Sequence, residues 1–408
     1  MRTVFRKPVL LLTMAVMAVR VSFAGEVDIL VKELMRKNVL TPGEAQDIMT
    51  RTKEETRKQL VMGDLDSAPA WTQKVGLKGD LRLRHQWEHD EGNSYNRIRQ
   101  RMRFRLQGNA VVTQRINVGF GLATGSADPR STNQTMENAF ETKGIQLDYC
   151  FVEYTAPKLF TLKGGKIPCK NTMWCISDLL WDSDVSLEGA NAMLEYNGFF
   201  LNAGIYDVDE SKTSSYDPRL VMFQPGFGTG ITDNMSVKVS ANVYNFQYLK
   251  GYPVVNLVHV AGTNSETGGV LDYAYNTTGV NAELKLKGFL LPLISVFGEI
   301  ITNSGTKDNN SGMLAGIKFG AEKVKDKGQW QGKIMTRTLE KDVWVDFLPD
   351  SDSYGGKTGI KGNEAALEYG LAKNVTLGFD YYRMTNIAAA SSAAKRQDLY
   401  QIDLIVKF

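Results

Sequence analysis

Apolar and polar side chains alternate one by one along most of the chain after about residue 76. In residues 97–111, one set of alternate positions carries Ile98, Met102, Phe104 and Leu106. The intervening positions are polar and mostly basic: Arg97, Arg99, Arg101, Arg103, Arg105, Gln107 and Asn109. Because successive side chains of a strand point to opposite faces, this period of two predicts a strand with one apolar and one charged face.

The alternation recurs many times and ends only at the last residue. Further clear examples are 116–122, 237–243, 280–286, 313–319 and 400–408. About sixteen such segments can be traced, an even number that is typical of single-chain bacterial barrels. The pattern predicts an all-β fold, a transmembrane antiparallel β-barrel of about 16 strands over 73–408.

The connections between these segments alternate in length, as in outer-membrane barrels. Asn197-Gly198 predicts a two-residue hairpin, whose central residues both need a positive φ. Longer polar loops are expected near 88–96, 125–144, 167–185, 207–218, 249–277, 340–362 and 384–397. Two segments break the rule, because the turn expected near 224–234 is long and the loop near 303–311 is short.

A large soluble β-protein is the alternative to a membrane barrel. A propeller would show a repeat of roughly 40–50 residues, and the sequence shows no such repeat. A soluble β-sandwich would bury one strand face in a dry core. The polar faces here carry rows of Arg, Lys and Glu, which a dry core could not hold. A wet lumen accommodates them, so the membrane barrel is favoured.

The first 24 residues are typical of an export signal. Arg2, Arg6 and Lys7 form the positive end, residues 8–19 form an apolar run, and cleavage is expected after Ala24. An uncleaved anchoring helix is the alternative, but the run is shorter than the ~20 residues that span a bilayer.

Residues 25–72 have helical spacing and many charges. Thr41 and Glu44 form a capping box at the start of a second helix, with Pro42 at its first position. A solvated helical segment in the periplasm is expected here, and a coiled-coil or cell-wall contact remains the alternative.

The C-terminus supports insertion into an outer membrane. Phe408 closes an alternating apolar strand, which resembles the signal read by the outer-membrane insertion machinery. The expected partners are therefore outer-membrane lipid and the barrel-assembly machinery.

Several stretches resemble the bacterial putative porin family of outer-membrane channels. They are Gly79-Asp80-Leu81-Arg82-Leu83-Arg84, the arginine-rich 96–106, 122–126 leading to 131–135, Val152-Glu153-Tyr154, Gly164-Gly165-Lys166, Leu180-Trp181-Asp182-Ser183-Asp184 and Glu188-Gly189. The likeness is strongest over 76–210 and thins toward the C-terminus. It implies a pore-forming barrel that passes small hydrophilic solutes or ions, with a homotrimer as the expected assembly. The segment around Cys169 and Cys175 departs from the pattern, so the third long loop is expected to differ in shape.

The charged positions suggest how a pore would be lined. Five arginines at alternate positions of 97–105 would form a column facing the lumen, extended by Arg82 and Arg84 on the preceding strand. If loop 167–185 folds inward, its acids Asp178, Asp182 and Asp184 would face this column across a constriction and create a transverse field. The alternative is a neutral structural ladder, in which the arginines pair with Glu153, Glu188 and Glu195.

Catalysis, metal binding and nucleic-acid binding find little support. The three histidines are His85, His89 and His259, and none has a recognisable nucleophile or metal-ligand partner. Positions i and i+4 of an extended strand lie ~13 Å apart, too far for one metal ion. No cofactor motif is present, and a net charge of +3 does not indicate a nucleic-acid binder.

Three cysteines occur in an exported chain, an odd number. A disulfide between Cys169 and Cys175 could close a small loop in an oxidising compartment, while Cys150 lies in a strand and could face lipid.

The sequence as a whole predicts a porin for passive diffusion. A plugged barrel serving as a surface scaffold or adhesin is the alternative, and long polar loops such as 249–277 would suit it.

Overall fold

In the computed structural model, the structure describes residues 74–408 apart from 158, 213–215, 258 and 388–393. In the N-terminal segment it describes residues 31–51 apart from 32, 38, 42, 43 and 46. The expected signal peptide therefore lies outside the described residues. The chain divides into two compact units, Met1–Gln73 and Lys74–Phe408, and each is treated by itself.

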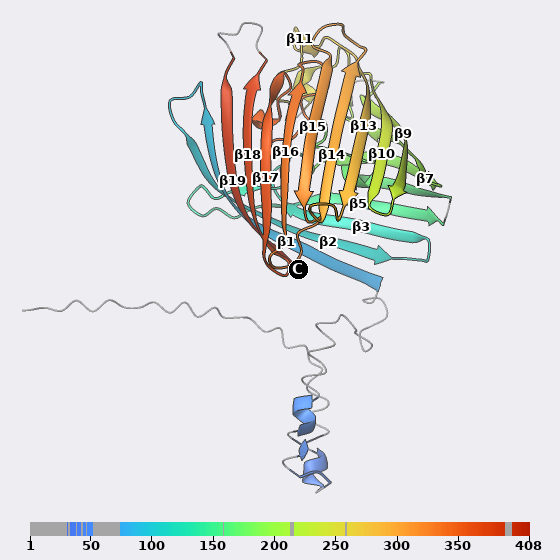
Figure 1. Ribbon diagram of the computed structural model, residues 1–408, viewed down its shortest axis with the longest axis vertical. Helices are drawn as coiled ribbons and strands as arrows, with labels where there is room; N and C mark the ends of the chain where they lie inside the picture. The colour runs from blue at the N-terminus through green and yellow to red at the C-terminus, as the bar shows by residue number, and fades with distance from the viewer. Residues whose placement is uncertain are drawn as a thin grey trace, which may run out of the picture. The chain divides into compact units, whose positions relative to one another are not determined.

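In the described part of the second unit, sixteen long antiparallel strands form a closed barrel (Figure 1). They are β1 (Val75–Asp90), β2 (Arg97–Val111), β3 (Ile116–Thr124), β5 (Ile145–Ala156), β6 (Phe160–Pro168), β7 (Ser186–Tyr196), β8 (Phe199–Asp207), β9 (Arg219–Thr232), β10 (Met235–Gln247), β13 (Tyr275–Lys287), β14 (Leu293–Asn303), β15 (Ser311–Gly320), β16 (Trp330–Leu339), β17 (Ile360–Ala372), β18 (Val375–Asn386) and β19 (Arg396–Lys407). Three two-residue strands, β4 (Gln134–Thr135), β11 (Glu266–Thr267) and β12 (Val270–Leu271), lie in loops. The predicted all-β barrel of about 16 strands is confirmed.

The barrel closes between its first and last strands. β1 pairs antiparallel with β19, and Asp80 lies opposite Lys407. Beyond that pair, the backbone N–H of Phe408 donates to the Gly79 carbonyl at 3.0 Å, and the Gly79 N–H donates back at 2.8 Å. A side chain at position 79 would be crowded, because a Cβ would lie 2.5 Å from the Phe408 ring and 2.8 Å from the Arg105 backbone oxygen. The terminal residue thus completes the seam of the barrel.

The outer face is apolar and carries aromatic residues near both ends. Trp87 packs against Tyr400 at a centroid distance of 5.0 Å, near the end with the long loops. Near the end with the short turns, Phe199 and Phe227 lie 4.7 Å apart. Aromatic girdles above and below an apolar band are the signature of a barrel in a bilayer. No helix among the described residues is long and apolar enough to cross a membrane.

Most turns at one end of the barrel are short, as the sequence predicts, and the longer connection 321–329 is the exception. Asn197 and Gly198 have φ of 49° and 84°, the two positive values that the hairpin requires. The expected long turn near 224–234 is wrong, because β9 continues to Thr232. Pro225 and three nearby glycines resemble a turn in sequence, yet they lie within the strand. Pro225 has no N–H to donate, and it has no partner in the register with β10.

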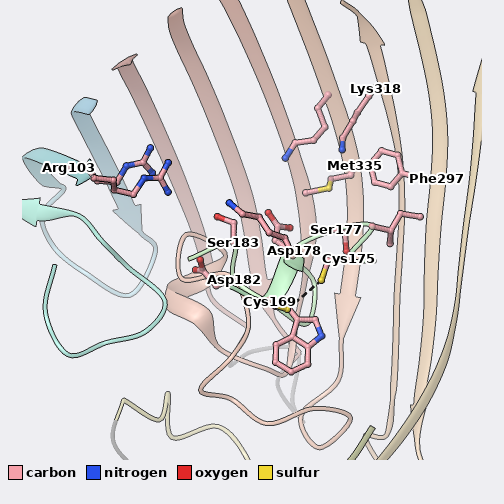
Figure 2. A pocket seen from close by; sticks show the side chains of 15 residues that line it. Arg103, Cys169, Cys175, Ser177, Asp178, Asp182, Ser183, Phe297, Lys318 and Met335 are labelled. Atoms are coloured by element: carbon pink, nitrogen blue, oxygen red, sulfur yellow. Dashed lines mark hydrogen bonds between the residues drawn. The ribbon is translucent and has the colours of Figure 1, made fainter. Parts of the chain in front are cut away.

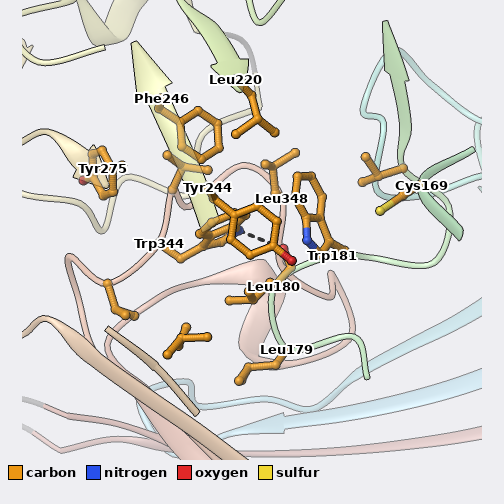
Figure 3. Close-up of a cluster of buried hydrophobic side chains, with 14 of the residues drawn as sticks. Cys169, Leu179, Leu180, Trp181, Leu220, Tyr244, Phe246, Tyr275, Trp344 and Leu348 are labelled. Atoms are coloured by element: carbon orange, nitrogen blue, oxygen red, sulfur yellow. Dashed lines mark hydrogen bonds between the residues drawn. The ribbon is translucent and has the colours of Figure 1, made fainter. Parts of the chain in front are cut away.

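Several loops at the other end fold into the barrel and build a dry core there. The loops that matter below are L2 (125–144), L3 (169–185), L5 (248–274) and L7 (340–359), defined by the strand ends. L3 contains the 3-10 helix η2 (Cys169–Asn171), L5 contains η3 (Val254–Asn256) and L7 contains η4 (Tyr354–Gly356). Trp344 of L7 is completely buried and packs on Trp181 of L3 and Tyr244 of β10 (Figure 3). Its indole N–H donates to the Leu180 carbonyl at 2.8 Å.

Polar contacts also join the loops to one another. Arg130 of L2 donates to the backbone carbonyls of Asp346 in L7 and His259 in L5, at 3.1 and 2.8 Å. Asp346 accepts in turn from the backbone N–H of Thr263 at 2.6 Å. Four loops are therefore linked at the long-loop end by both packing and hydrogen bonds.

In the N-terminal unit, the expected capping box is present. Glu44 accepts from the Thr41 backbone N–H at 2.9 Å, and the Glu44 N–H donates to the Thr41 hydroxyl at 3.3 Å. Thr41 and Glu44 therefore form the predicted reciprocal cap.

Candidate functional site

The candidate site is the constriction inside the barrel, and the arginines of β1 and β2 form one side of it. Arg103 is 7% exposed, whereas Ile98 on the opposite face of β2 is 60% exposed. Because Arg105 contacts Asp184 of the inward-folded L3, the arginine face of β2 points into the lumen. The alternation in the sequence also places the arginines on one face, because successive side chains of a strand point to opposite faces.

Most of these arginines are held in ion pairs. Arg84 donates from two guanidinium nitrogens to Asp403 of β19, both at 2.7 Å, and from the third to Asp352 of L7 at 2.9 Å. Arg103 and Arg105 share Asp80 of β1, at 2.8 and 2.9 Å. Such bidentate, buried contacts fix the guanidinium planes and neutralise much of their charge.

The remaining arginines of the column are less fully paired. Arg82 lies 3.5 Å from Asp403 and donates to Asn133 of L2 at 2.5 Å. Arg101 donates to Gln86 and to Ser131 of L2, both at 3.3 Å, and no carboxylate of the described chain lies within salt-bridge distance of it.

Arg99 and Arg97 lie near the long-loop end of β2. Arg99 pairs with Glu88 at 3.0 Å, while Arg97 is exposed. Carboxylates thus compensate Arg84, Arg99, Arg103 and Arg105. Among the described residues, Arg97 and Arg101 have no carboxylate within salt-bridge distance.

The acids that compensate the column are not the ones considered for a structural ladder. Glu153 pairs with Lys163 of β6 at 3.3 Å. Glu195 is exposed near the Asn197-Gly198 turn. Glu188 pairs with Lys166 at 2.6 Å, and it lies on the face of β7 opposite Asn191, whose amide donates to Thr172 of L3. Glu188 therefore does not pair with the column, and its role in lining the pore stays a prediction.

The three acids of L3 have three different surroundings. Asp184 lies 3.5 Å from Arg105 and accepts from Thr132 of L2 at 2.8 Å. Burial raises its pKa, but Arg103 and Arg105 outweigh that effect and hold the pKa below its usual value. Only this acid faces the arginine column directly.

Asp182 faces the loops rather than the column. It accepts from the backbone N–H groups of Asp184 and Ser351, at 3.0 and 2.8 Å. Burial, together with the negative charge of Asp184, raises the pKa of Asp182 well above its usual value. Asp182 therefore links L3 to L7.

The third acid of L3, Asp178, pairs with an arginine outside the column that the sequence did not indicate. Arg337 of β16 is 3% exposed and binds Asp178 at 2.9 Å, Asp350 of L7 at 3.3 Å and also Glu364 of β17. Ligand atoms of these three acids lie within 4.8 Å of one another, close enough to suggest a metal site. The guanidinium of Arg337 bonds to all three, so it serves as their counterion and anchors L3 and L7 to the wall.

A cavity of about 400 Å³ lies beneath L3, between the arginine column and the wall formed by β14, β15 and β16. Figure 2 shows Arg103 on one side, Lys318 and Phe297 on the other, and L3 between them. L3 contributes Lys170, Ser177 and both of its cysteines, and β16 contributes Lys333. The constriction is therefore a small, mainly basic chamber.

The two cysteines of L3 lie close together as thiols. Their sulfur atoms are 3.5 Å apart, whereas a disulfide bond measures about 2.05 Å. Burial raises the pKa of the Cys169 thiol, which suppresses the reactive thiolate. The loop disulfide stays a prediction. Cys150 is exposed on β5.

The histidines lie apart from the constriction. His85 and Gln100 are hydrogen-bonded on the outer face at 2.7 Å, and His89 contacts Asn96 at 2.7 Å. His259 is in L5, where its carbonyl accepts from Arg130.

Comparison with known proteins places this barrel among the porins. A model of the putative porin family matches residues 89–279 and 266–408. A high-pH structure of Pseudomonas putida OprB is similar over 86% of this chain and 96% of its own, with 12% identity and a TM-score of 0.57. Two mutants of the Rhodopseudomonas blastica porin align over 82% of this chain and all of theirs, at 12% identity and TM-scores of 0.47 and 0.48. No curated protein matches the sequence.

Proposed function

Because the chain belongs to the putative porin family, we propose that it forms a narrow water-filled channel in the outer membrane. Small hydrophilic solutes and ions would cross it by passive diffusion. The observation that carries this proposal is the charged inner wall. Arg101 of β2, Lys318 of β15 and Lys333 of β16 face the barrel interior, and two of them line its cavity. A hydrated lumen suits such charges, which a dry interior would not.

Single-channel recording in a planar bilayer tests this function. The refolded mature protein should give stable open steps in potassium chloride. The conductance should be small, because L3 and L7 occupy part of the lumen. Failure to observe steps from a well-folded barrel would contradict the proposal.

The dry core between L3 and L7 favours a second candidate, a plugged barrel that displays its loops as a surface scaffold or adhesin. Val343, Trp344 and Val345 are completely buried inside the barrel. Packing of this kind closes part of the cross-section. A silent barrel whose loops bind host or neighbouring surfaces would support the scaffold over the channel.

The assembly that we propose is a homotrimer, as the family likeness implies. Four small residues of β6, β7 and β8 lie in register with one another: Gly164 pairs with Ala190, and Ala192 pairs with Ala203. Small side chains allow close approach of a second barrel there. Mass measurement of the detergent-solubilised protein would give three chains per particle, and a single chain would contradict the trimer.

We also propose that residues 1–24 are removed on export and that 25–72 remain in the periplasm. Barrel-assembly machinery would recognise the C-terminal strand that ends in Phe408. The chain would act without a catalytic residue, cofactor or nucleic acid.

A further inference from the structure

The cavity beneath L3 holds more cations than its neighbouring acids compensate. Arg103, Arg105, Lys170, Lys318 and Lys333 line it. The two arginines are paired through Asp80 and Asp184. Lys333 binds Glu364, which also binds Arg337.

The other two lysines have no such partner. Among the described residues, no carboxylate lies within salt-bridge distance of Lys170 or Lys318. The Lys318 ammonium lies 5.0 Å from the centroid of Phe297, a cation–π contact that holds the chain on the wall and leaves its N–H donors for another group. Burial lowers the pKa of Lys170, and the charge of Arg105 adds to that effect. A negative charge beside Lys170 would offset both the cost of burying its ammonium and the repulsion from Arg105.

The acids that line the same cavity are already engaged. Asp178 binds Arg337, and Asp182 accepts backbone N–H groups with both oxygens. The chamber therefore presents free ammonium donors, while its carboxylates are bound to the protein.

Resting on the proposed channel function, we propose that this cavity is a binding site for small tetrahedral oxyanions such as phosphate. Lys170 on L3, Lys318 on β15 and Arg105 on β2 line the chamber and would attract an anion that enters it. A compact ammonium with three donors suits a phosphate as a point charge. A volume of about 400 Å³ holds such an ion with several waters. The site would raise the local concentration of oxyanions inside the barrel beneath L3.

The test is phosphate block of chloride current through the wild-type protein. Added inorganic phosphate should reduce the chloride current in a saturable manner, and sucrose at the same concentration should not. The K170Q/K318Q variant should need about tenfold more phosphate for half block, because two charge-assisted contacts are lost. K285Q is the matched control, since Lys285 lies on β13 beside that wall, pairs with Glu283 at 3.5 Å and does not line the cavity.

Two outcomes would overturn the site. One is chloride current that phosphate leaves unchanged, and the other is equal block in wild type and K170Q/K318Q; in both, the channel itself would stand. If the wild type carries no current, equilibrium dialysis with radiolabelled phosphate decides instead. Saturable binding that K170Q/K318Q loses and K285Q retains would support the site without the channel, and absence of binding would refute it.

Discussion

Removing the Trp344 side chain should release the two loops that narrow the barrel. Trp344 is 0% exposed, and its ring lies 5.1 Å from Trp181, 5.0 Å from Tyr244 and 5.3 Å from Phe246. Replacing a buried Trp by Ala costs about 3–5 kcal/mol. The carbonyl of Leu180 also loses its indole donor.

This loss falls on the loop contacts and not on the strand ladder. If all of it acts on docking of L7 against L3, the undocked population rises roughly a hundredfold to several thousandfold. We expect Trp344→Ala to give larger and noisier single-channel steps, while the folded barrel keeps its resistance to denaturation in detergent. Trp344→Phe keeps most of the packing and loses the hydrogen bond, at a cost of about 1 kcal/mol. Its single-channel steps should lie between those of wild type and Trp344→Ala in size and noise.

Trp330→Ala is the control, because Trp330 is 37% exposed on the outer face near the short turns and packs on Phe319. It should leave the current steps as in wild type. Identical conductance and noise in Trp344→Ala and wild type would refute the loop-docking argument. So would unfolding of the whole barrel by that substitution.

Three further predictions concern the arginine column, the cysteines and the C-terminus. The double variant R101Q/R103Q should shift the reversal potential toward cations, since Arg101 has no carboxylate partner within salt-bridge distance in the described chain; unchanged reversal potentials would count against a filter. After mild oxidation and then unfolding in denaturant, Cys169 and Cys175 should both resist alkylation, and full alkylation of both would exclude the bond. Deleting Phe408 should lower the yield of barrel assembled in cells, because two backbone hydrogen bonds of the seam are lost; unaltered assembly would contradict a role for this residue in insertion.

Strand alternation made the barrel predictable, because each strand has one face toward lipid and one toward the interior. The same alternation identified the arginine column on β2. Pro225 shows the limit of this reasoning, since its turn-like sequence occurs within β9, where the missing N–H is tolerated without a partner on β10.

The ion-pair partners required the register between strands, which alternation alone does not give. Asp80 lies opposite Arg105 in the β1–β2 ladder, and Asp403 lies opposite Arg84 across the closing seam. The first pair follows a hairpin and could have been found by counting back from its loop. The second joins residues 319 positions apart, so only closure of the barrel brings them together.

The dry loop core was the least predictable feature. The sequence predicts loop 340–362 from its polar character, yet Trp344 near its start is buried inside the barrel. Its partners Trp181 and Tyr244 come from a different loop and from the wall. The role of Arg337 could not be predicted for a similar reason, because the three acids that it binds come from L3, L7 and β17.

The most direct test of the central claim is single-channel current from the refolded mature protein in a planar bilayer under a salt gradient. The account predicts stable open steps of small conductance, with a reversal potential on the anion side that reflects Arg101, Lys170 and Lys318. A well-folded barrel that carries no current under these conditions would contradict the channel and favour the plugged scaffold.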